Sequence, residues 1–241
     1  MARKSRVGGV EFLLTGTEHK LSMLRTNGWS GFPAFIVAGG PSLRSFDFSL
    51  LRGVPHCIAI NAAFYDVPTA EVMISEDARV FERFAPDLAN FKGVKIFACP
   101  DDAYVPQVKA IAPDVEIVHT RPKSKGWSKR LEDGLSTSSC SLIPALNLAD
   151  VMGANPIYLL GVDLDDDPSN YHKRYPSTWS TGSAQMESYR SDCEHWAAPN
   201  LRHRAIINLN KSSAVTSWAR TNAEYNDAVR AALKAHERVM A

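Results

Sequence analysis

The chain has 241 residues, of which 45% are hydrophobic and 22% are charged, and its formal net charge is +1. This is the composition of a folded globular protein, so it excludes a chain that is disordered throughout. The small net charge excludes a global field that would attract nucleic acid, so any such contact would need a local basic patch.

The four cysteines are far apart and form no CxxC pair, which predicts free thiols in a reducing compartment. Cys57 and Cys99 lie in apolar runs and are expected to be buried. No apolar run of 7–15 residues follows the basic N-terminus, and the sequence has no stretch of about 18 apolar residues. We therefore predict a cytoplasmic protein with no signal peptide and no membrane contact.

Short apolar runs recur along the chain, and most are separated by enough residues for a crossover helix. Such runs are typical of strands that are buried on both faces of a parallel sheet. We therefore predict an α/β, Rossmann-like fold, with a mostly parallel sheet flanked by helices in a single domain over residues 1–241. The runs cover residues 34–39, 57–60, 71–75, 94–98, 115–118, 157–160 and 205–209.

Two segments, 139–152 and about 221–239, carry apolar residues at helical spacing. Gly153 is expected to end the first helix in a left-handed conformation. Residues 1–32 precede the first strand and are assigned as an N-terminal extension. Residues 164–204 are polar and irregular, which is typical of a lid or a substrate-binding loop.

The loop after the first strand reads Gly39-Gly40-Pro41-Ser42. Glycines at a strand end let the backbone come close to a ligand, and the N–H groups and hydroxyl that follow can hold phosphate or a nucleotide. The loop lacks the later glycine of the dinucleotide fingerprint and the lysine of the Walker motif. An ordinary turn would explain it as well.

Polar residues also follow two later strands, where open α/β sheets place their ligands. Asn61 comes after the strand 57–60, and its amide suits a base or a ribose, although it would also suit a turn cap. Asp163 comes after the strand 157–160 and is predicted to bind a ribose or a metal ion. The aspartates at 165–167 read as a solvated acidic turn.

Three further segments carry groups that could bind anions or transfer protons. Ser138 and Ser139 lie in a hydroxyl-rich helix start, which can bind an anion, although capping alone would explain one or two of its hydroxyls. His172 and His195 could act as acid or base, or could simply be solvated, and Arg174 could neutralise phosphate. Residues 121–130 combine five cations with Trp127, which suits single-stranded nucleic acid, a donor-pyrophosphate lid or a solvated loop.

The order of these elements resembles a superfamily of bacterial CMP-sialic acid sialyltransferases, archaeal 6-hydroxymethylpterin diphosphokinases and uncharacterised phage proteins. The resemblance covers roughly residues 33–218 and rests on Gly-Pro-Ser-Leu at 40–43 and Leu-Gly-Val-Asp at 160–163. It implies a nucleotide at the carboxyl edge of the sheet. It also implies a loop histidine as base and tyrosines on the leaving phosphate. The nucleotide would be held by Gly40, Ser42, Asn61, Ser138, Ser139 and Asp163, the base would be His172 or His195, and the tyrosines would be Tyr171 and Tyr175.

The leading functional expectation is a glycosyltransferase-like enzyme that moves a sugar from a nucleotide-sugar donor to an acceptor hydroxyl. The acceptor could be a small molecule or a modified nucleic-acid base. A first alternative is a diphosphokinase of a hydroxymethylated heterocycle, which would use ATP and Mg²⁺ at Asp163 and its neighbours. A second alternative is a nucleic-acid-associated binding module, which would contact DNA through residues 121–130. No metal is predicted for the leading reaction.

Overall fold

A computed structural model describes residues 4–7, 10–13, 24–167, 169–176, 179 and 182–240. Its centre is a nine-stranded sheet in which every neighbouring pair of strands is parallel. Helices flank the sheet, so the predicted Rossmann-like α/β fold is confirmed. The strands are β3 (Ala34–Val37), β4 (Cys57–Ile60), β5 (Val72–Ser75), β6 (Val94–Cys99), β7 (Glu116–Arg121), β8 (Leu135–Ser136), β9 (Ile157–Leu160), β10 (Ile206–Asn208) and β11 (Ala219–Arg220).

The strand β3 shows why these short apolar runs form a buried sheet. Its side chains alternate between two separate hydrophobic cores, with Ala34 and Ile36 in one and Phe35 and Val37 in the other. All four residues are fully buried. A strand that must bury both faces is apolar at every position, so its sequence is continuous and not alternating.

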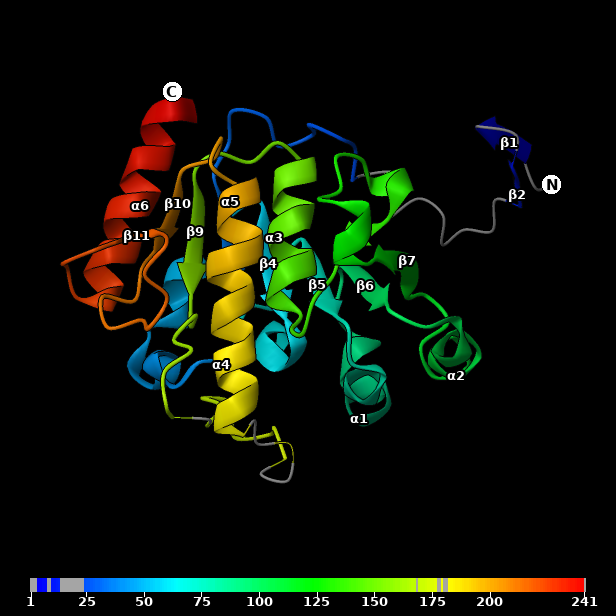
Figure 1. Cartoon of the computed structure of the whole chain (residues 1–241), viewed down its shortest axis with the longest axis horizontal. Coiled ribbons are helices and arrows are strands. Elements are labelled where there is room, and N and C mark those ends of the chain that lie inside the picture. Colours follow the sequence, from blue (N-terminus) through cyan, green and yellow to red (C-terminus); the bar gives the residue numbers. More distant parts are fainter. Residues whose placement is uncertain are drawn as a thin grey trace.

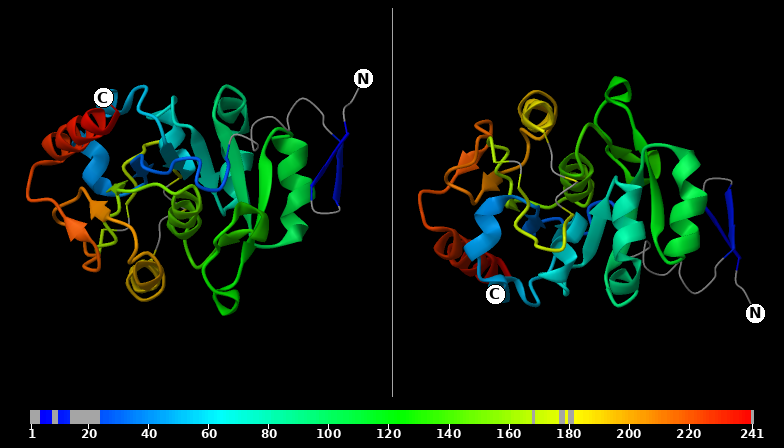
Figure 2. Two further views of the ribbon diagram at one scale, coloured as in Figure 1. Left: turned by 90° about the horizontal axis from the view of Figure 1, so that it is seen from above. Right: turned by 90° about the horizontal axis from the view of Figure 1, so that it is seen from below.

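The two cores lie on opposite faces of the sheet, and each is covered by its own helices (Figures 1 and 2). One face carries α3, α4 and α5 with the turn between the last two, and the other carries α1, α2 and α6. The helices are α1 (Ala78–Leu88), α2 (Val105–Ile111), α3 (Leu142–Val151), α4 (Ser183–Asp192), α5 (Ala198–Asn200) and α6 (Tyr225–Met240), and a π-helical turn (Cys193–Ala197) joins α4 to α5.

The predicted helices at 139–152 and 221–239 correspond to α3 and α6, which begin three to four residues later than expected. Gly153 ends α3 with φ +83°, as predicted. All ten residues of α3 are buried, so this helix has no solvent-exposed face. The polar segment 164–204 is only partly a loop, because α4, the π-helical turn and α5 occupy its second half.

The assigned N-terminal extension contributes to the core at its C-terminal end. Trp29 is 2% exposed, and its backbone N–H donates to the carbonyl of Met152 at 2.7 Å. Its indole Nε1 also donates to Glu71 at 3.3 Å. Farther upstream, β1 (Lys4–Val7) and β2 (Val10–Leu13) form an antiparallel pair. Within the described residues, no helix is long and apolar enough to cross a membrane.

Candidate functional site

The candidate site lies where the strand order reverses. From β3, one half of the sheet continues through β4 to β8 and the other through β9 to β11. In open α/β sheets, ligands bind at the carboxyl ends of the strands beside such a switch point. A cavity of about 440 Å³ opens there, which is within the usual size of a small-molecule site. Its walls come from residues 38–41 after β3, 60–61 at the end of β4, 141–142 at α3 and 161–164 after β9. They are completed by Ser169, Asn170, His172, Lys173, Tyr175, Pro176, Trp179, Met186 and Tyr189.

Gly40 is required because the chain passes very close to the end of β9. Its backbone N–H donates to the carbonyl of Gly161 at 2.9 Å. A Cβ atom at position 40 would lie 2.5 Å from that carbonyl oxygen and 2.5 Å from the Asp163 carboxylate. The backbone of Gly40 has φ −66°, an ordinary value for any residue. Close approach, and not backbone conformation, therefore selects glycine here.

Ser42 and Asp163 bind each other across the switch point. The backbone N–H and the hydroxyl of Ser42 donate to the two oxygens of Asp163 at 2.7 Å and 2.6 Å. Asn210, after β10, adds a third donor at 2.7 Å. Burial raises the pKa of Asp163, while these hydrogen bonds favour its ionised form. These hydrogen bonds of Asp163 join three chain segments. Both carboxylate oxygens of Asp163 accept hydrogen bonds from the protein, so the structure gives no support to a Mg²⁺ site at Asp163.

Asn61 is a polar residue of the cavity whose side-chain oxygen lacks an internal partner. It lines the cavity at the end of β4 and begins a 3₁₀ turn, Asn61–Tyr65. Its side-chain oxygen is buried and accepts no hydrogen bond from the described residues. Its φ of +54° is uncommon for a residue other than glycine, although asparagine adopts it more readily than most. An unpaired buried acceptor and an unusual backbone conformation are both typical of functional positions.

The predicted serines do bind a carboxylate, but it belongs to the protein. The hydroxyls of Ser138 and Ser139 both donate to Asp192 at the end of α4, and Lys123 forms an ion pair with the same residue. Burial opposes ionisation of Asp192, but these partners outweigh it and lower its pKa. The residue of this segment that lines the cavity is Ser141.

The loop residue His172 lies at the cavity, between Arg174 and Asp66. Its Nδ1 accepts the backbone N–H of Arg174 at 3.2 Å, so the neutral ring carries its proton on Nε2. That nitrogen faces a carboxylate oxygen of Asp66 at 3.3 Å. The ring is stacked on Tyr65, and burial lowers the pKa of His172 despite the nearby Asp66. His172 is therefore neutral near pH 7.

The remaining predicted loop residues are divided between the cavity and other surroundings. Tyr175 lines the cavity, and burial raises the pKa of its phenol to about 12. Tyr171 instead stacks on Phe48, and its buried hydroxyl has no described partner. Arg174 points to solvent and lies over the ring of Tyr65. His195 is exposed on the π-helical turn and is not among the described residues that line the cavity.

The predicted basic loop is partly built into the body of the protein. Trp127 is 6% exposed, and its indole nitrogen donates to the buried Asp150 of α3 at 3.0 Å. Trp127 is therefore not available to stack on a base, as the binding-module alternative requires. Lys123 is also occupied, because it pairs with Asp192.

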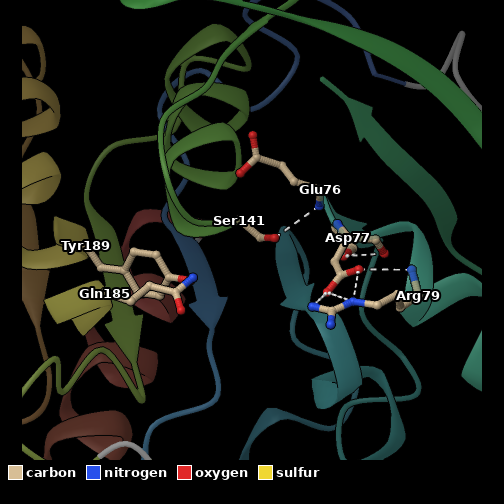
Figure 3. A network of polar contacts seen from close by, with 7 residues as sticks. Glu76, Asp77, Arg79, Ser141, Gln185 and Tyr189 are labelled. Atoms are coloured by element: carbon tan, nitrogen blue, oxygen red, sulfur yellow. Dashed lines mark hydrogen bonds and ion pairs between the residues drawn. The ribbon is translucent and has the colours of Figure 1, made fainter. Parts of the chain in front are cut away.

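Sequence reasoning did not identify Glu76, which follows β5 at the same edge of the sheet. Figure 3 shows Glu76, Asp77 and Arg79 across from Gln185 and Tyr189 of α4, with Ser141 between the two groups. The backbone N–H of Glu76 donates to the Ser141 hydroxyl at 3.0 Å, and its carboxylate accepts from Thr137. Burial, with a smaller contribution from Asp192, raises the pKa of Glu76 to about 7. A carboxyl group with this pKa can exchange protons near neutral pH.

The raised pKa of Glu76 predicts that Glu76→Gln stabilises the fold at alkaline pH. The folded pKa of about 7 lies above the ordinary value of 4.5. The folded state therefore binds more protons between these values, and the wild type loses stability as pH rises through them. The substituted amide cannot ionise, so the advantage of the variant should grow by on the order of 2 kcal/mol between pH 5 and pH 8. Urea unfolding at both pH values measures this change, with exposed Glu132→Gln as the control, and an advantage that does not grow with pH contradicts it.

Comparison with known proteins supports the fold. No family model matches the chain, and no curated protein matches its sequence. Among solved structures, the chain is similar to the MAf glycosyltransferase of Magnetospirillum magneticum AMB-1, with a TM-score of 0.54 and 15% identity. That match covers 90% of this chain but 40% of the other. The sialyltransferase CstII of Campylobacter jejuni, solved with cytidine-5'-monophosphate, matches with a TM-score of 0.48 and 13% identity over 82% of this chain and 87% of that one. The chain therefore shares an α/β fold with a glycosyltransferase and spans less than half of that protein.

Proposed function

We propose that this protein is a glycosyltransferase that binds a nucleotide-sugar donor in the cavity at the switch point. The observation that carries the proposal is Asn61, whose buried side-chain oxygen has no described partner and whose side chain lines that cavity. A buried acceptor without a partner costs about 1–3 kcal/mol, so it indicates a donor group supplied by a ligand. The amino group or ribose hydroxyl of a nucleotide provides such a donor.

The surroundings of Asn61 support a phosphorylated ligand. The glycines at 39–40 bring the backbone to the cavity wall without side chains in the way. Lys173 lines the same cavity and is exposed, so its ammonium group is available to a phosphate. The wall formed by Tyr175, Trp179 and Tyr189 is aromatic, and such side chains pack well against the apolar face of a sugar ring. A glycosyltransferase with the same fold adds to this support.

In the proposed reaction, His172 is the base, and the carboxylate of Asp66, 3.3 Å from Nε2, stabilises the protonated ring. The acceptor hydroxyl replaces the Arg174 amide at Nδ1 and gives up its proton there. The acceptor oxygen then bonds to the anomeric carbon as the bond from that carbon to the donor phosphate breaks. The departing electron pair stays on the phosphate, where Lys173 and Tyr175 stabilise the charge. The His172 ring is neutral near pH 7, as a base must be.

A binding experiment tests the nucleotide site. The panel contains CMP, CDP, UDP, GDP, UDP-glucose, CMP-sialic acid and ATP, each with and without Mg²⁺. We expect the nucleotides of one base to raise the melting temperature of the protein without Mg²⁺. The rise should be a few degrees when the ligand concentration is about 100 times its dissociation constant. Asn61→Ala should weaken binding of that ligand about 5-fold, since one hydrogen bond contributes about 1 kcal/mol.

The control for this variant is Asn90→Ala, which changes an exposed asparagine remote from the cavity. It should leave the nucleotide affinity unchanged. If no compound in the panel binds, or if Asn61→Ala binds as tightly as the wild type, the proposed site is wrong. Stabilisation that requires both ATP and Mg²⁺ would instead favour the diphosphokinase.

A further inference from the structure

A second group of chemically active side chains lies at the same edge of the sheet but outside the cavity. Cys99 is the last residue of β6, His119 lies in β7, and Asp102 begins the 3₁₀ turn Asp102–Tyr104. One ligand atom from each residue lies within 4.8 Å of the other two. The Nδ1 atom of His119 is 3.0 Å from a carboxylate oxygen of Asp102. None of the three is among the described residues that line the cavity.

The backbone fixes the positions of these three residues. Cys99 and His119 are direct register partners in the parallel pair of β6 and β7, so their Cα atoms are held side by side. The hydroxyl of Thr120, next to His119, donates to the carbonyl of Cys99 at 3.2 Å. Asp101 caps the short turn by accepting the backbone N–H of Ala103 at 2.9 Å, and Asp102 in this turn reaches His119.

The three ligand types select a zinc-class ion. A thiolate, an imidazole and a carboxylate are the ligands of zinc and related late transition metals, whereas Mg²⁺ and Ca²⁺ prefer oxygen alone. A tetrahedral zinc ion separates its ligand atoms by about 3.3–3.7 Å, given bonds of about 2.0–2.3 Å. His119 and Asp102 are 63% and 83% exposed, so small side-chain rotations can reach this spacing.

We propose that Cys99, His119 and Asp102 bind one zinc-class transition-metal ion at the β6–β7 edge, with the fourth position open to solvent. The thiol of Cys99 is buried and lies 3.1 Å from the carbonyl of Asp101, on the protein side of the site. Metal binding must release the proton of this thiol, as coordination of a thiol does. The exposed His119 and Asp102 complete the site from the solvent side.

Cobalt spectroscopy of the full chain tests this proposal. The protein is freed of metal with a chelator and titrated with Co²⁺ at pH 7.5. We expect a thiolate-to-cobalt charge-transfer band in the near ultraviolet that saturates at one equivalent and disappears when Zn²⁺ is added. Cys99→Ser should abolish the band, and His119→Ala and Asp102→Asn should each weaken Co²⁺ binding by about 10-fold or more.

The variants separate a metal site from the simpler arrangement of a surface His–Asp pair beside a buried thiol. His119 and Asp102 are exposed, so their variants are expected to fold even if Cys99→Ser does not. Cys140→Ser, which changes a cysteine just before α3, is the matched control and should keep the band. Absence of a band in the wild type, or a band that survives both Cys99→Ser and His119→Ala, overturns the proposal. Neither result bears on the nucleotide cavity.

Discussion

Gly40→Ala is expected to destabilise the protein by about 3 kcal/mol or more and to lower its melting temperature by about 6–12 °C. The added methyl group would lie 2.5 Å from both the Gly161 carbonyl oxygen and the Asp163 carboxylate. Neither neighbour can move freely, because Gly161 accepts the N–H of residue 40 and Asp163 is held by Ser42 and Asn210. The substitution must therefore separate the ends of β3 and β9.

Gly182→Ala is the matched control for this prediction. Gly182 precedes α4 with φ −69° and ψ 158°, and Gly40 precedes its 3₁₀ turn with φ −66° and ψ 149°. The two glycines thus share a backbone conformation and a position before a helix, but nothing lies within 4 Å of a Cβ atom at Gly182. Thermal and urea unfolding of both variants measure the difference. Equal stability of the two variants would mean that crowding at Gly40 is not what selects glycine.

His172→Ala is expected to reduce sugar transfer by about 10²–10⁴-fold if the proposed function holds, which is the usual effect of removing a general base. The affinity for the nucleotide should change little, because in the proposal the ring contacts the acceptor hydroxyl and not the donor base. His195→Ala should retain full activity, because His195 is exposed on the π-helical turn away from the cavity. Steady-state rates with the donor found in the binding panel, together with donor affinity, measure both effects.

The pH dependence of the rate separates a base from a residue that only supports the loop. Burial lowers the pKa of His172, so the wild-type rate should fall when the pH drops below that lowered value and the ring is protonated. A residual rate in His172→Ala that keeps the same acid limb would contradict the assignment of His172 as the base. Loss of nucleotide affinity in that variant would show instead that the ring mainly holds the loop in place.

Much of the sheet could be predicted from the sequence, because a strand buried on both faces must be apolar at every position. The run 157–160 matches β9 residue for residue, and the run 57–60 matches β4. The polar residues that follow such strands also fall where the fold requires them. Asn61 and the loop at 39–41 therefore line one cavity although they are separated in sequence.

The partners of the polar residues could not be predicted, because they depend on contacts between distant segments. The hydroxyls at 138–139 suggest a site for a ligand anion, but Asp192 from α4 provides that negative charge. Ser42 is predicted to bind the nucleotide, but its hydroxyl donates a hydrogen bond to Asp163, which lies 121 residues later in the chain. Glu76 carries no local motif, and its raised pKa arises only when the folded chain buries it beside Asp192.

The burial of Trp127 likewise depends on a contact with a distant segment and could not be predicted from its local sequence. Its basic surroundings in the sequence suggest an exposed ring, but the buried carboxylate of Asp150 holds its indole inside. Asp150 lies 23 residues later in the chain, on a helix whose ten residues are all buried. A local reading of residues 121–130 therefore identifies the cations correctly but cannot show which side chains the fold withdraws from the surface.

The central position of β3 has a consequence for how the chain folds during synthesis. The ribosome makes β3 first among the strands of the large sheet, yet one of its two neighbours is β9, where Ala34 pairs with Ile157. Until residue 160 has left the exit tunnel, one edge of β3 has no backbone partner, and such edges invite aggregation or chaperone binding. The nascent chain can pair β3 with β4 early, but the other edge of β3 stays unpaired until β9 has been made. The segments that form the two walls of the cavity are therefore synthesised at different times. The wall that follows β9 is the slower to form.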